Sequence, residues 1–203
     1  MAHVLNETKQ HLIEATSDLM DAHALEDISA AMVLDKSGAS KSSMYHFFED
    51  FSDLLEETFL QRFAASVQAS DKAIKEIIEK SITQEGFFTA LETVTKNSQA
   101  RENSAIRFQR ARMLARSEGS DRFRKSLGEI QQQLTDSLTH AFEIAQEKGF
   151  LNKDFEARTG AVFIQAYTLG KVVDDITANH MNDKDWEKLI SRIAREVLGS
   201  KNN

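Results

Sequence analysis

The residues best suited to chemistry form one short run, Ser37 to Phe48, in which polar side chains follow a glycine. Those that can donate a hydrogen bond to oxygen are Ser40, Lys41, Ser42, Ser43, Tyr45 and His46. Side chains of these types contact phosphates and base edges in nucleic acids. The run therefore indicates a helix that contacts DNA, and an ordinary helical hairpin is the alternative.

Local signals predict how this run is positioned. Gly38 supplies a permissive backbone for a tight turn. Ser40 is a strong helix N-cap, so the helix should begin at Lys41. Its first turn then offers free N–H groups and the positive end of the helix dipole to a phosphate. The apolar residues expected to anchor the helix from behind are Met44, Phe47 and Phe48.

The preceding residues predict two further helices. Apolar residues recur at helical spacing between about Glu7 and Ala22. Ser29 can cap a second, short helix that ends at Lys36. A short helix, a tight turn and another short helix make a helix-turn-helix. Asp50 should then cap a long fourth helix.

Over residues 1–60 the chain resembles the TetR family of one-component transcriptional regulators. The matching residues are Ser29, Val33, Gly38, Ala39, Ser40, Lys41, Ser43 (for Thr), Met44, Tyr45, Phe48, Asp50 and Leu54. The resemblance implies an N-terminal DNA-binding domain, a helical domain for ligand binding and dimerisation, and release of DNA when a small molecule binds. Together with the residue types of the run, it predicts that the DNA contacts are made by Ser29, Ser40, Lys41, Ser42, Ser43, Tyr45 and His46.

The same region departs from the family pattern. Ala24 and Ser42 stand where glycine is common, and Phe51 stands where a lysine usually contacts phosphate. Residues 1–60 hold three basic residues and twelve acidic ones, whereas a duplex-binding domain normally has the opposite sign. An N-terminal domain that binds a protein partner instead of DNA is therefore the alternative.

Composition predicts an all-α fold of about nine helices. The 203-residue chain has no proline and 8 glycines, which favours uninterrupted helices. We expect a helix-turn-helix domain at 1–50 and a ligand-binding and dimerisation domain at 51–203. In the latter, Gly86 should end a helical segment over 72–81, and Gly149 should end a helix over 120–148. Two more helices are expected over 155–180 and 184–198.

Those last two helices are rich in apolar residues and resemble the family's dimer interface, a four-helix bundle. The residues expected there are Ala161, Ile164, Leu169, Trp186, Ile190 and Ile193. Packing within the monomer core is the alternative. A homodimer would suit a palindromic operator, because a two-fold site needs a two-fold protein.

A basic stretch between residues 100 and 125 holds eight basic residues and three acidic ones. In the family this region lines the effector pocket, where an inward arginine would favour a carboxylate or phosphate on the ligand. The expected ligand-binding residues are Phe87, Arg107, Phe108, Arg110, Phe142, Phe163 and Tyr167. The alternative is a solvated or ion-paired basic face, with the aromatic residues in the core.

Signatures of catalysis are largely missing. The sequence has no Gly-x-Ser-x-Gly elbow and no His-Glu-x-x-His pair, and its six histidines are scattered. We expect neither an enzyme nor a metal or cofactor, and interpret Asp174, Asp175 and His180 as a solvated polar face. Without cysteine, a signal peptide or a long apolar run, a cytoplasmic protein with no membrane contact is expected.

The sequence as a whole thus predicts a ligand-responsive regulator. It would be a repressor that leaves double-stranded operator DNA when a small-molecule effector binds.

Overall fold

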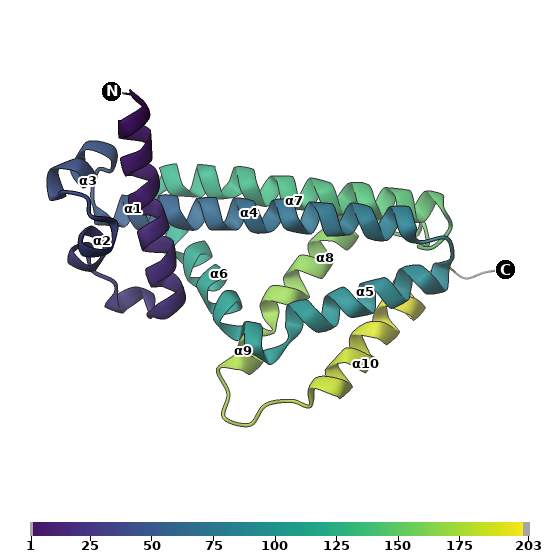
Figure 1. Ribbon diagram of the computed structural model, residues 1–203. Helices are drawn as coiled ribbons and strands as arrows, with labels where there is room; N and C mark the ends of the chain where they lie inside the picture. Colours follow the sequence, from purple (N-terminus) through teal and green to yellow (C-terminus); the bar gives the residue numbers. More distant parts are fainter. Residues whose placement is uncertain (1, 201–203) are drawn as a thin grey trace. The chain divides into compact units, whose positions relative to one another are not determined.

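The computed structural model describes residues 2–200, with side chains for 7–200, and is built from α-helices (Figure 1). Within these residues it has no strand, only an isolated bridge between Leu151 and Gly199. The predicted all-α fold is confirmed. None of the described helices is long and apolar enough to cross a membrane.

The chain divides into two compact units between Ser66 and Val67, a point inside a long helix. The first unit contains α1 (Ala2–Ala22), the 3-10 turn Leu25–Asp27, α2 (Ala30–Ser37), α3 (Lys41–Phe47) and the start of α4 (Phe51–Lys80). Its buried core is formed by Leu12, Ile13, Ala15, Leu19, Ile28, Val33, Met44, Phe48 and Leu54.

The first unit extends beyond residue 50 because the beginning of α4 belongs to its core. Leu54 is fully buried there and Phe51 packs against the same cluster. Asp50 caps α4 as predicted, since its Oδ1 accepts a 2.8 Å hydrogen bond from the Asp53 amide. Arg62, more than two turns further along α4, donates 2.8 Å hydrogen bonds to the carbonyl and hydroxyl of Ser17.

The second unit contains the rest of α4 and six more α-helices. These are α5 (Gln84–Gln99), α6 (Ser104–Arg116), α7 (Asp121–Glu147), α8 (Ala157–Gly170), α9 (Val172–Asp175) and α10 (Asp183–Ile193), which continues as a π-helical turn, Ala194–Leu198. Helix α7 packs along α8, and α10 packs against α5. The buried cluster includes Ile78, Phe87, Phe88, Phe142, Ala145, Phe150, Leu151 and Ala157.

The helix boundaries predicted around Gly86 were wrong. Gly86 does not interrupt a helix but lies in the first turn of α5, where its amide donates to the Thr83 Oγ1 cap at 3.1 Å. Residues 72–81 are mostly the end of α4, and the break follows at 81–83. The cap predicted at Gly149, with φ of +74°, is confirmed, and Asn182 caps α10 by accepting hydrogen bonds from the Lys184 and Asp185 amides.

The helix predicted over 155–180 is shorter and broken. It is interrupted at Lys171 and ends at Asp175. The carboxylate of Asp174 accepts a 2.9 Å hydrogen bond from the Met181 amide, and the Asp174 carbonyl accepts one from Thr177 at 3.0 Å. These bonds fold the following residues back, so His180 lies in a loop.

Candidate nucleic-acid interface

The turn between α2 and α3 depends on Gly38. Its φ of +67° lies in the left-handed region, which other residues rarely adopt. The Ser37 hydroxyl accepts a 3.2 Å hydrogen bond from the Ala39 amide on the far side of the glycine. The Ser37 side chain therefore helps the backbone to close the turn.

Serine side chains shape the start of both short helices. Ser29 caps α2 by accepting a hydrogen bond from the Met32 amide at 3.3 Å. Ser40 caps α3 through the Ser43 amide at 3.0 Å, and its Oγ also lies 2.9 Å from Ser42 Oγ and 2.8 Å from Ser43 Oγ. Both predicted caps are confirmed, and the second gathers three hydroxyl groups at the first turn of α3.

The opposite faces of α3 have different surroundings. Met44 is fully buried in the core of the first unit, followed by the buried Phe48. On the other face Lys41, Ser42 and His46 are exposed and Tyr45 is half exposed. The structure thus places six of the seven predicted DNA-contact residues on α3 or its cap, and Ser29 at the start of α2.

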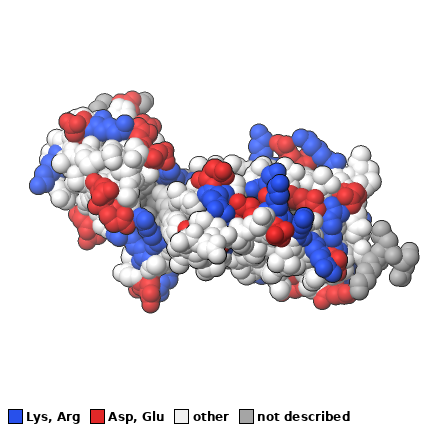
Figure 2. Space-filling model, turned by 90° about the horizontal axis from the view of Figure 1, so that it is seen from below, with Lys and Arg blue, Asp and Glu red and all other residues white. Residues whose placement is uncertain are grey.

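Most basic groups of the first unit are occupied. Lys36 forms a 3.1 Å ion pair with Asp18, and Lys9 lies 3.6 Å from Glu57. The Lys41 ammonium lies 5.9 Å from the centre of the Tyr45 ring, with no ion pair to any residue of 7–200. Acidic and basic side chains are interspersed on the face of the molecule shown in Figure 2. Hydrogen-bond donors and one lysine, more than net charge, therefore equip α3 to bind phosphates and bases.

The predicted aromatic ligand residues lie in separate groups of the second unit. Phe87 contacts Phe150, with ring centres 5.6 Å apart, and Phe142 contacts Phe155 at 6.1 Å, all within the core. Phe163 is partly exposed and packs on Tyr167, whose pKa is raised by burial. Phe108 is half-buried on α6.

The guanidinium of Arg107 is bonded to other groups of the chain and is not free to bind a ligand. It forms a two-pronged ion pair with Asp175, at 2.6 and 2.8 Å, and donates to the carbonyls of Ser98 and Ala100 at 3.3 and 3.1 Å. The hydrogen bonds from Arg107 hold the pKa of Asp175 below its ordinary value. The interpretation of Asp175 as a solvated residue was therefore wrong, because its side chain is only 2% exposed.

Arg110 belongs to a polar chain that joins three helices. Its guanidinium donates to Gln131 at 2.9 Å, and Gln131 in turn donates to Gln165. Gln165 donates to the Thr135 hydroxyl at 3.2 Å. Burial lowers the pKa of Arg110. Of the two predicted arginines, Arg107 is thus bound to a carboxylate, whereas Arg110 donates to a neutral glutamine. Sequence reasoning missed the two glutamines, which no local pattern marks.

The residues predicted for a dimer interface are divided between core and surface. Ala161 and Ile190 are buried within the unit itself. The half-buried members are Ile164, Leu169, Trp186 and Ile193. The exposed apolar residues on α8 to α10 and just beyond them are Val162, Phe163, Val173, Ile176, Leu189 and Val197. A dimer interface on these helices would therefore use the face that carries these exposed residues, next to the predicted one.

Comparisons with known proteins identify the fold. No family model matches the sequence, and no curated protein matches it. A crystal structure from Mesorhizobium loti, described as a TetR-family transcriptional regulator, has a TM-score of 0.73 and 14% identity over 96% of this chain and 98% of that one. Escherichia coli NemR in its reduced form has a TM-score of 0.70 and 16% identity, over 96% and 100%. A TetR transcription regulator from Haloarcula marismortui gives 0.68 and 13%, also over 96% and 100%. The chain therefore has the fold of the TetR-family transcriptional regulators.

Proposed function

We propose that this chain is a ligand-responsive, DNA-binding transcriptional regulator that acts in the cytoplasm and has no catalytic activity. The observation that carries the proposal is α3, whose buried Met44 and Phe48 fix a helix that presents Lys41, Ser42 and Tyr45 outward. A recognition helix held in this way places its N-terminal side chains in the major groove of DNA. The likeness to solved regulators supports this assignment.

The regulator acts as a homodimer on a palindromic operator. Support comes from the exposed apolar residues of α8 to α10, since soluble proteins seldom leave such a set uncovered. A small-molecule effector that binds the second unit releases the operator, so the protein is a repressor.

A second candidate function is binding of a protein partner by the first unit. The excess of acidic residues over 1–60 favours it, together with the ion pairs that occupy Lys9 and Lys36. The three-serine cap of α3 and the exposed Tyr45 favour DNA, because these groups serve hydrogen bonding to an oxygen-rich ligand.

Selection of genomic DNA fragments by the purified protein at low salt separates the two functions. Recovery of a shared palindromic sequence supports the DNA-binding regulator. Recovery of no sequence above background would overturn it and favour the protein partner. Gly38→Val, which forces a β-branched residue into the left-handed turn conformation, should abolish the enrichment. Gly119→Ala, outside the first unit and with open space around the added methyl group, is its control.

A further inference from the structure

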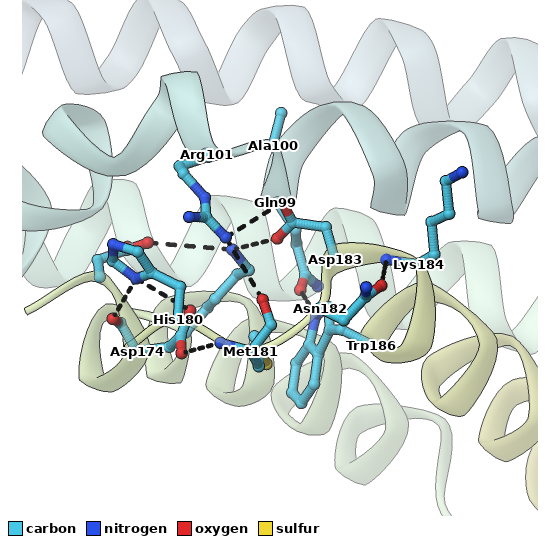
Figure 3. A network of polar contacts seen from close by, with 12 residues as sticks. Gln99, Ala100, Arg101, Asp174, His180, Met181, Asn182, Asp183, Lys184 and Trp186 are labelled. Atoms are coloured by element: carbon cyan, nitrogen blue, oxygen red, sulfur yellow. Dashed lines mark hydrogen bonds and ion pairs between the residues drawn. The ribbon is translucent and has the colours of Figure 1, made fainter. Parts of the chain in front are cut away.

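A cavity of about 180 Å³ lies in the second unit, where the end of α5 meets the start of α10. Its walls include Gln99, Arg101, Lys171, Asp183 and Trp186. Figure 3 shows Gln99, the last residue of α5, and Arg101, just beyond it, beside Trp186 and Asp183. The aromatic residues that the sequence predicted for ligand binding do not line this cavity.

Gln99, which lines the cavity, carries an unused hydrogen-bond donor. The residue is only 4% exposed, and the Trp186 indole N–H donates to its Oε1. An indole N–H can only donate, so this bond fixes the orientation of the amide and leaves Nε2 as the free end. Nε2 is buried and has no hydrogen-bond partner among the described residues. A buried donor without a partner is costly, so it marks a place where an acceptor is missing.

Lys171 provides a second weakly satisfied donor in the same wall. The residue is 3% exposed, yet its ammonium lies 3.5 Å from Asp183 and 3.9 Å from Asp175. Both distances exceed those of a good charged hydrogen bond. Arg107 already binds the Asp175 carboxylate at 2.6 Å, so Lys171 is the more distant partner of that carboxylate. A buried ammonium with such long contacts favours a further anionic acceptor.

The acidic residues of the cavity do not supply that acceptor. Asp183 divides its carboxylate between Lys171 and Arg101, the latter at 3.3 Å. Glu102 is exposed and Glu187 half-buried, so water can solvate both carboxylates. The donors without a good partner, on Gln99 and Lys171, are thus buried. The acceptors that remain, the carboxylates of Glu102 and Glu187, are open to solvent.

We propose that this cavity binds a small organic carboxylate, with its oxygens on Gln99 Nε2 and Lys171 Nζ and its carbon chain against the Trp186 ring. The volume suits a ligand of a few carbon atoms. The inference that this carboxylate is the effector rests on the proposed function. Binding of a carboxylate in the cavity is tested without DNA.

Trp186 is the chain's single tryptophan, so its fluorescence reports occupancy of the cavity directly. Sodium butyrate is titrated into the purified full chain at constant ionic strength, with butyramide and butylammonium as probes that lack the negative charge. We expect a saturable change in emission with butyrate. The dissociation constants of butyramide and butylammonium should be higher by roughly tenfold or more, because these probes lose a charged hydrogen bond.

Gln99→Glu is the sharpest variant, because it has the same shape, keeps an acceptor for Trp186 and replaces the free donor with a negative charge. It should weaken butyrate binding by roughly tenfold or more. Lys171→Met should do the same, whereas Lys125→Met, exposed on α7, should bind as the wild type does. Circular dichroism confirms that each variant is folded.

A wild-type protein without a saturable response to butyrate overturns the proposal. So does equal affinity for butyrate in the wild type and in folded Gln99→Glu. Because no DNA takes part, either failure leaves the DNA-binding function standing, and loss of operator binding alone would leave this site standing.

Discussion

At the residue scale, the ion pair between Arg107 and Asp175 is deeply buried in the second unit, with side chains 5% and 2% exposed. Removal of Arg107 leaves the buried Asp175 carboxylate with only the Lys171 ammonium, 3.9 Å away, and breaking a buried pair typically costs about 3–5 kcal/mol. We therefore expect Arg107→Ala to lower the free energy of unfolding by an amount in that range, measured by urea denaturation.

The control for this substitution is Arg124→Ala. Its pair with Asp121 is largely exposed, at 3.5 Å, and exposed pairs contribute about 0–1 kcal/mol. Equal effects of the two substitutions would contradict the structural role assigned to Arg107.

The same pair predicts a dependence of stability on pH. The guanidinium of Arg107 lowers the pKa of Asp175 in the folded chain below its unfolded value near 3.8. The stabilisation is therefore complete above the unfolded pKa and is lost as pH falls through the lower, folded pKa. Asp175→Asn should flatten the acid side of the stability curve below about pH 4. An unaltered acid limb in thermal unfolding would refute this.

Residue-scale features were predictable where the signal is local. The caps at Ser29, Ser40 and Asn182 each bond to an amide two or three residues away, so a short stretch of sequence contains both partners. Arg107 and Asp175 are 68 residues apart, and nothing local links them. The sequence therefore marked the arginine as a ligand-binding candidate without showing that its donors are already used.

At the element scale, the close approach of α7 and α8 depends on Gly160. A methyl group there would lie 2.7 Å from Phe142 Cδ1 and 2.8 Å from Phe155 Cε2, well inside contact distance. Because Phe142 is buried, Gly160→Ala should destabilise the chain by about 1–3 kcal/mol through overpacking.

Gly128→Ala is the matched substitution, in the middle of α7 with open space around the added methyl group. Alanine is favoured over glycine in a helix by about 1 kcal/mol, so this change should stabilise the chain. Urea unfolding of both variants measures the difference, and a stabilised Gly160→Ala would contradict the packing described.

The apolar face of α8 to α10 predicts the behaviour of the assembly. Val162→Glu and Leu189→Glu place a charge on exposed positions of these helices, and each should convert a dimer to a monomer in sedimentation at micromolar concentration. Ile106→Glu, exposed on α6, should leave the dimer intact. A monomeric wild type, or a dimer unaffected by the first two changes, would refute the proposed interface.

Element boundaries were predictable only where capping residues set them. The beginning of α3 follows from Ser40, and the end of α7 follows from Gly149. The break after Gly170 does not, because the residues that follow it bind distant partners: Lys171 pairs with Asp183, and Asp175 pairs with Arg107. Helical periodicity alone predicted that the helix continues to His180.

At the scale of the whole molecule, the proposed DNA binding has few charges available. Each neutralised phosphate contributes about −0.9 to the slope of log affinity against log salt. Lys41 and Lys36 are the lysines nearest the turn, and Asp18 already pairs with Lys36. A dimer should therefore show a slope no steeper than roughly −4, measured by titrating operator binding against salt. A slope twice as steep would mean that other basic residues reach the DNA.

The central claim, that α3 reads DNA, is tested most directly by the affinity of the selected duplex for two α3 variants. Ser43→Ala keeps the backbone cap on Ser40, and Tyr45→Ala removes a half-exposed ring, so both should fold. In fluorescence anisotropy each should weaken binding by about 1–3 kcal/mol, while Gln61→Ala, exposed on α4, binds as the wild type does. Unchanged affinity in both α3 variants, with unchanged helicity, would contradict the account.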